Sequence, residues 1–291
     1  MRIKFENFWG GFPIHDNIVT VALKLRHHVE IVNDDADVIV CQGPRSHKDN
    51  NAITISWFVE SMSRIGEPNY DNCDYSLNSC NFDDNRNYRI PFWSTQINWN
   101  DAAVHDITRG PTYYISPEKL YWREITQRER MCCSVATGTR GRRAHFYPMI
   151  SQKLPVDHGG DFLRNTTEML AKPGNSDYLE KIEFISKYKS HLCFENDDRD
   201  GYVCEKILHA FYAGCVPIYW GPKNVGEDFN KKAFIDISDF GSWEEAINHV
   251  REVLDDDSKL LAYLREPVFE NNKIPHHATP KALSDFFERI L

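Results

Sequence analysis

Apolar residues along the chain follow two kinds of pattern, and each predicts one type of secondary structure. Short apolar runs between polar segments are typical of strands in a parallel sheet, whereas apolar residues three or four positions apart indicate helices with one buried face. The first pattern predicts strands at residues 2–8, 37–41, 52–59, 128–137, 191–196 and 215–220. The second predicts helices at residues 142–154, 176–188, 204–213, 242–256 and 280–291.

Strands and helices alternate in two stretches of the chain, separated by a weakly periodic segment at residues 66–122 that is rich in Asn, Asp, Tyr and Trp. The spacing at residues 16–27 fits a helix or a strand, and a helix there completes a βαβ unit. Such alternation is typical of α/β domains with parallel sheets. We therefore expect an α/β fold of two Rossmann-like domains facing a cleft, over residues 1–122 and 123–291. The last helix can pack back on the first domain.

Composition narrows the class of protein. The chain has 291 residues, of which 41% are hydrophobic, so it can form buried cores of ordinary size. Its net charge of −9 argues against broad contact with nucleic acid or an anionic membrane, because both bind basic surfaces. It contains no run of eighteen uncharged apolar residues and no apolar segment of the signal-peptide type near its start. We expect no nucleic-acid partner and no membrane segment.

The eight cysteines could suggest a secreted protein held by disulfides. Five of them lie within or beside apolar runs, where a free thiol behaves as a small hydrophobic group. No two cysteines are spaced as C-x-x-C, and no cysteine and histidine spacing resembles a metal site. We therefore expect reduced thiols in the cores.

The segment FENDDRDGYVCEKILHAFYAGCVPIYWG, residues 194–221, carries the clearest candidate chemistry. It joins a predicted strand, a polar loop, a helix that Gly214 ends, and a second strand, which together form a βαβ unit. Ligands of such units bind at the carboxyl ends of the strands, and the helix N-terminus favours anions. Lys206 in the first helical turn opposes the helix dipole unless an anion neutralises it, so it predicts a phosphate site. A solvated lysine on an amphipathic helix is the alternative.

Several motifs near this segment resemble the α1,3/4-fucosyltransferases, which are inverting enzymes with a GT-B fold that use GDP-fucose. The motifs are FEN, GYVCEK with Cys204 in place of the usual Thr, AGCVPIYWG, FIDISDF and, upstream, GGDFLRNTTEML. The resemblance is strong over about residues 128–245 and weak in the N-terminal half. It implies no required metal or other cofactor, and bacterial members resemble this chain most.

The resemblance also implies roles for individual residues. Asn196, Tyr202, Lys206 and Arg164 would hold the diphosphate, Glu205 would bind the ribose hydroxyls, and Arg143 would lie near the donor. Arginine and lysine suit these roles, because a departing GDP gains negative charge that they stabilise in the transition state.

A metal-dependent chemistry is the rival hypothesis for the diphosphate. Asp198 and Asp200 follow the FEN strand with one residue between them, and paired carboxylates of this kind hold Mg²⁺ or Mn²⁺. Asp35 and Asp37 have the same spacing but precede their strand, which is the wrong end for a ligand site.

Inverting transfer also needs a base that takes the proton of the attacking hydroxyl. Glu60 ends the apolar run of residues 52–59 and is the candidate base, and Glu67, directly before Pro68, is the alternative.

Aromatic residues of the segment that follows predict where an acceptor sugar binds, because rings stack on sugar faces. Trp93, Trp99 and Tyr88 are the candidates, although aromatic side chains also serve as core. The resemblance implies transfer to a GlcNAc hydroxyl of an N-acetyllactosamine-type glycan. The sequon at Asn165 is interpreted as an unused match, because no signal peptide accompanies it.

Three alternatives remain: a transferase for another GDP-sugar, a sugar-nucleotide-binding protein without catalysis, and a lectin-like module. The presence of Glu60 together with Lys206 and Arg164 favours a catalyst. We expect a cytoplasmic enzyme of bacterial or viral type, or a Golgi enzyme whose anchor has been removed.

Overall fold

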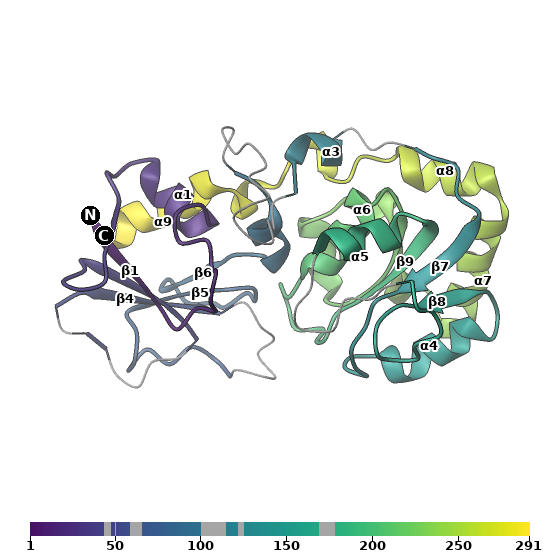
Figure 1. The fold of residues 1–291 in the computed structure, drawn as a ribbon, viewed down its shortest axis with the longest axis horizontal. Coiled ribbons are helices and arrows are strands. Elements are labelled where there is room, and N and C mark those ends of the chain that lie inside the picture. The colour runs from purple at the N-terminus through teal and green to yellow at the C-terminus, as the bar shows by residue number, and fades with distance from the viewer. Residues whose placement is uncertain (44–47, 50, 59–65, 100–114, 122–124, 169–177) are drawn as a thin grey trace. The chain divides into compact units, whose positions relative to one another are not determined.

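The computed structural model describes residues 1–43, 48–49, 51–58, 66–99, 115–121, 125–168 and 178–291. The chain divides into two compact units (Figure 1). Unit 1 comprises Met1–Tyr114, Asp200–Tyr202 and Ile274–Leu291, and unit 2 comprises Ile115–Arg199 and Val203–Lys273. The C-terminal segment therefore belongs to the same unit as the N-terminus. In the described part of the chain, no helix combines the length and the apolar character that crossing a membrane requires.

Unit 1 is built on a parallel sheet with the strand order β2-β1-β3-β4-β5-β6. The strands are β1 (Arg2–Glu6), β2 (Glu30–Ile31), β3 (Val38–Gln42), β4 (Ile53–Phe58), β5 (Tyr75–Asn78) and β6 (Asn87–Arg89). Two α-helices, α1 (Ile18–Lys24) and α9 (Pro280–Ile290), contact each other and contribute to the core of this unit. The unit is therefore an α/β structure, as the sequence predicts.

Local chemistry explains why α1 and α9 form where they do. The Asn17 side chain caps α1 by accepting a hydrogen bond from the Thr20 N–H at 3.0 Å, which resolves the helix-or-strand ambiguity in favour of a helix. Thr279 caps α9 and Pro280 occupies its first turn, where a missing N–H has no cost. The buried face of α9 packs against the core of unit 1 through Leu283 and Phe286, each worth roughly 1.5–3 kcal/mol on burial.

Unit 2 is built on a second parallel sheet, with the strand order β11-β10-β9-β7-β8. Its strands are β7 (Arg130–Ser134), β8 (Val156–His158), β9 (Tyr188–Phe194), β10 (Val216–Trp220) and β11 (Ile235–Asp236). Its helices are α3 (Pro117–Tyr121), α4 (Arg143–Ser151), α5 (Tyr178–Ile185), α6 (Glu205–Tyr212), α7 (Trp243–Asp255) and α8 (Asp257–Arg265). Helices α5 and α6 lie side by side on one face of the sheet (Figure 1).

Each expected helix and each expected strand has a counterpart among the described residues. The predicted helix at residues 204–213 is α6, with Cys204 at its N-cap. The pattern missed β2, β5, β6, β8 and β11, which are only two to four residues long, too short for a periodicity to show. All eight cysteines are buried and unbridged, as expected of core thiols.

Candidate donor-binding site

The site is built where β9, α6 and β10 meet at one edge of the sheet of unit 2. Parallel strands place their carboxyl ends at the same edge, so the residues after Phe194 and the end of β10 at Trp220 lie together. Glu195 joins them, because its N–H donates to the Trp220 carbonyl at 2.8 Å. Its carboxylate accepts the Cys204 N–H at 2.7 Å, directly before α6 begins. The start of α6 is thereby attached to the end of β9.

Lys206 lies in the first turn of α6 between two carboxylates. Its Nζ is 2.8 Å from Glu195 Oε2 and 3.8 Å from Glu205 Oε2, and 18% of the side chain is exposed. On the other side of Glu205, Lys181 of α5 approaches Oε1 at 3.4 Å. Burial by itself would raise the pKa of Glu205, but the charges of Lys206 and Lys181 outweigh it and hold that pKa below its usual value. Glu205 is therefore an ionised acceptor near neutral pH.

Arg143 and Asn196, both predicted to lie near the donor, are in contact. Arg143 is the first residue of α4, and its buried guanidinium donates from Nη2 to Asn196 Oδ1 at 2.7 Å and to the Phe194 carbonyl. Gly141 makes this packing possible, with a φ of +65°. A Cβ on Gly141 would lie 2.5 Å from the Glu195 carbonyl oxygen and 2.7 Å from the Trp220 ring. The turn before α4 therefore requires glycine.

Arg164 lies on the loop after β8. Its Nη2 pairs with Asp161 at 3.1 Å, and 36% of its side chain is exposed. The next residue, Asn165, uses its side-chain amide within the unit: Oδ1 accepts the His158 N–H at 2.7 Å, and Nδ2 donates to the Val156 carbonyl at 2.9 Å. The sequon asparagine therefore has a structural role in holding this loop against β8.

Tyr202 belongs to a short part of the loop before α6 that groups with unit 1, and its side chain is buried. Two contacts within unit 1 hold this part of the loop. Asn81 Nδ2 donates to Asp200 Oδ2 at 2.8 Å, and Arg89 Nη2 donates to the Gly201 carbonyl at 2.8 Å. Asp200, one of the rival metal ligands, is thus bonded to an amide, and within the described ranges no group of three or more potential metal ligands occurs.

The three candidate acceptor-binding residues pack within unit 1. Trp93 is fully buried, and Trp99 Nε1 donates to the Ser94 carbonyl at 3.0 Å. The Tyr88 hydroxyl donates to the His277 carbonyl at 2.7 Å, and burial raises the pKa of that hydroxyl well above its usual value. These placements match the core role that the sequence leaves open for them. Contact with a sugar stays a prediction.

The described residues do not decide between the two candidate bases. Glu60 lies outside the described residues. Glu67 is an exposed residue in the segment before β5. The choice between them stays a prediction from the sequence.

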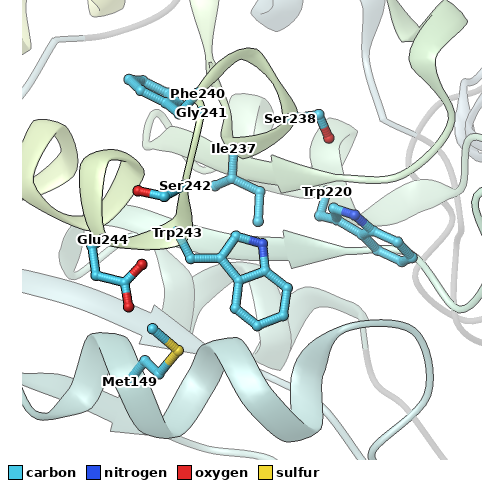
Figure 2. Close-up of a pocket in the computed structure, with 9 residues that line it drawn as sticks. All are labelled: Met149, Trp220, Ile237, Ser238, Phe240, Gly241, Ser242, Trp243 and Glu244. Carbon is cyan, nitrogen blue, oxygen red and sulfur yellow. The ribbon is translucent and has the colours of Figure 1, made fainter.

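A separate cavity of about 450 Å³ opens in unit 2 beside the end of β10. Figure 2 shows Trp243 between Glu244 and Trp220, with Met149 of α4 below it. The charged side chain among the lining residues is the carboxylate of Glu244, which would repel a diphosphate. The cationic groups that suit a diphosphate are therefore those at the start of α6 and α4.

Sequence reasoning missed two residues of the site, Glu195 and Lys181. Glu195 had a signal, because an ionisable residue directly after a buried strand lies at the ligand-binding edge of a parallel sheet. No signal in the sequence indicated Lys181, because its partner Glu205 is 24 residues away on another helix.

The comparisons with known proteins agree with this arrangement. The family model described as "Glycosyltransferase family 10 (fucosyltransferase) C-term" matches residues 125–277. An α-(1,3)-fucosyltransferase of Helicobacter pylori is 28% identical over 284 residues, covering 86% of this chain and 56% of that protein. A putative fucosyltransferase of Acanthamoeba polyphaga mimivirus is 27% identical over 154 residues, covering 50% of this chain and 25% of that protein. The chain thus spans about half or less of the length of these relatives.

Solved structures agree in fold. A crystal structure of an α1,3-fucosyltransferase superposes with a TM-score of 0.75 at 24% identity, covering 100% of this chain and 89% of that one. A crystal structure of α1,3-fucosyltransferase with GDP-fucose superposes with a TM-score of 0.73, covering 100% and 90%. The expected GT-B type of α/β fold and the family resemblance are confirmed. The chain belongs to glycosyltransferase family 10, the fucosyltransferases.

Proposed function

We propose that the protein is an α1,3-fucosyltransferase that moves L-fucose from GDP-fucose to a GlcNAc hydroxyl of an N-acetyllactosamine-type glycan, with inversion. Family membership and the activity named for the Helicobacter pylori relative support this proposal. The observation that carries it is Lys206, a partly exposed cation in the first turn of α6, whose partner Glu195 directly precedes the Asn196 that Arg143 contacts. A helix N-terminus with such cations suits a diphosphate.

In the proposed reaction the bond between fucose C1 and the GDP β-phosphate oxygen breaks, and its electron pair leaves with GDP. The diphosphate gains negative charge as this happens. Lys206, Arg143 and Arg164 then stabilise the transition state more than the ground state, and Glu205 positions the nucleotide by accepting ribose hydroxyls. Tyr202 and Asn196 add hydrogen bonds to the phosphates.

The acceptor hydroxyl attacks C1 from the face opposite GDP, and its proton goes to a carboxylate. Glu60 is the proposed base, with Glu67 as the alternative. In this proposal the cationic side chains neutralise the diphosphate, so no metal is required.

The experiment is a donor and acceptor panel on the full chain. GDP-fucose and GDP-mannose are each offered with N-acetyllactosamine, free GDP is measured, and the product linkage is read by NMR. We expect acceptor-dependent GDP release from GDP-fucose and an α1,3-linked product. Release from GDP-mannose alone would favour the transferase for another GDP-sugar. Binding of GDP-fucose without transfer to any acceptor would favour the non-catalytic protein.

A matched pair of variants locates the donor site. Lys206→Met should weaken GDP binding by roughly tenfold or more, because it removes a charged hydrogen bond. Lys153→Met, which changes an exposed lysine between the end of α4 and the start of β8, should bind GDP like the wild type. Equal GDP affinity in both variants would contradict the phosphate role of Lys206.

A further inference from the structure

Four charged side chains form an alternating row across the proposed donor site. Glu195 follows β9, Lys206 and Glu205 begin α6, and Lys181 comes from α5. The oxygen-to-nitrogen distances along the row are 2.8 Å from Glu195 to Lys206, 3.8 Å from Lys206 to Glu205, and 3.4 Å from Glu205 to Lys181. The row therefore consists of two outer pairs that are shorter than the central one.

The row is largely removed from water. The exposed fractions of the side chains are 0% for Glu195, 18% for Lys206, 13% for Glu205 and 9% for Lys181. A buried charge needs a partner of opposite sign, and the four charges sum to zero. Lys206, the most exposed of the four, is the one best able to reach a ligand while keeping its bond to Glu195, because an ammonium has three donors.

We propose that Glu195 and Lys181 are positioning residues that hold Lys206 and Glu205 apart, so that Lys206 binds phosphate and Glu205 binds ribose. This inference rests on the proposed function. Without either outer partner, Lys206 and Glu205 would pair with each other, since they are neighbours on one helix and only 3.8 Å apart. Both contacts with the nucleotide would then weaken together.

Glu195 is suited to this role because its own position is fixed from two sides. One carboxylate oxygen accepts the Cys204 N–H at 2.7 Å, and its backbone N–H donates to the Trp220 carbonyl at 2.8 Å. The other oxygen is left to bind Lys206. The ammonium therefore has a fixed anchor at the end of β9.

Lys181 is suited to hold Glu205 because the neighbouring histidines do not carry charge. Burial and the charge of Lys181 lower the pKa of His191 to about 3 and that of His209 well below its usual value. Lys181 is thus the cation outside α6 whose charge lowers the pKa of Glu205 most.

Two simpler roles, one for Glu195 and one for Lys181, predict binding results that differ from those of the positioning role. If Glu195 only competed with the phosphate for Lys206, removing its charge would tighten GDP binding. If Lys181 only stabilised the fold, its loss would lower the melting temperature without changing which part of the nucleotide is recognised.

The test measures binding of GDP and of 2′,3′-dideoxy-GDP to the full chain by calorimetry. The wild type should bind GDP more tightly than 2′,3′-dideoxy-GDP. The ratio of these two affinities reports the contact of Glu205 with the ribose hydroxyls. Lys181→Met should remove the preference and also weaken dideoxy-GDP binding by roughly tenfold, because Lys206 turns toward Glu205. Lys181→Arg should restore both. Lys187→Met, at an exposed lysine near the same helix, should behave like the wild type.

A double-variant cycle isolates the inferred pairing. With Glu205→Gln present, Lys206 has no carboxylate on α6 to turn toward and keeps its bond to Glu195, so adding Lys181→Met should leave dideoxy-GDP affinity unchanged. This double variant removes two opposite charges and leaves no unpaired buried ion from that pair. If Lys181→Met alone does not fold, Glu195→Gln with and without Glu205→Gln gives the same comparison.

Three outcomes would overturn the inference. Tighter GDP binding by Glu195→Gln would make Glu195 a competitor of the phosphate. If Lys181→Met changed dideoxy-GDP affinity equally with and without Glu205→Gln, this would contradict the inferred pairing of Lys206 with Glu205. If Lys181→Met kept the wild-type affinity for dideoxy-GDP and the wild-type preference for GDP, this would contradict the positioning role but not the proposed function. The proposed function itself would fail separately, by absence of GDP binding in the wild type.

Discussion

His191 makes the stability of unit 2 depend on pH. It lies within β9 with 1% of its surface exposed, and its Nδ1 is 3.2 Å from the Cys133 carbonyl oxygen. Burial, together with the charge of Lys181, lowers the pKa of its imidazole to about 3. The ring is therefore neutral in the folded protein and can donate from Nδ1 to that carbonyl.

The sign and size of the effect follow from this pKa. An unfolded histidine has a pKa of about 6.5, so the unfolded state binds more protons below that pH. The stabilisation is complete above about pH 6.5 and is lost progressively as the pH falls toward 3. Between pH 7 and pH 5, His191 alone should lower the free energy of unfolding by about 2 kcal/mol.

The assay is urea unfolding of the wild type and His191→Asn at pH 7 and pH 5, followed by tryptophan fluorescence. The variant loses packing at both pH values, so only the change between them is compared. The wild type should lose about 2 kcal/mol more than the variant. The contribution from the buried His158, whose pKa is also lowered by burial, cancels in this difference. His28→Asn, at an exposed position, should follow the wild type. Equal losses in wild type and His191→Asn would refute the reasoning.

Three further predictions concern activity and local structure. Glu60→Ala should keep GDP affinity and lose roughly 10²–10⁴-fold in turnover, whereas Glu67→Ala should lose much less; the reverse result would reassign the base. EDTA should leave most transfer intact, and a tenfold loss that Mn²⁺ restores would instead support the Asp198 and Asp200 hypothesis. Gly141→Ala should destabilise the protein by roughly 1–3 kcal/mol through its positive φ and close contacts, while Gly138→Ala, with open space around it, should not.

Much of the β9–α6–β10 unit was determined by the sequence itself. Its strands and helix follow from apolar periodicity, which depends only on residues a few positions apart. The stop at Gly214, with a φ of +75°, and the family motifs are local in the same sense. These signals were sufficient to predict an anion-binding helix start at Lys206 and the class of protein.

The tertiary structure alone decided the partners of the charged side chains. Arg143 meets Asn196 across 53 residues of chain, and Lys181 meets Glu205 across 24. It also decided that Gly201, in the loop before α6, bonds to Arg89 in unit 1. No local pattern encodes such contacts, because they depend on how separate strands and helices pack and not on the period of any one of them. Local periodicity therefore identified the elements of the site, and packing selected the charges that surround Lys206.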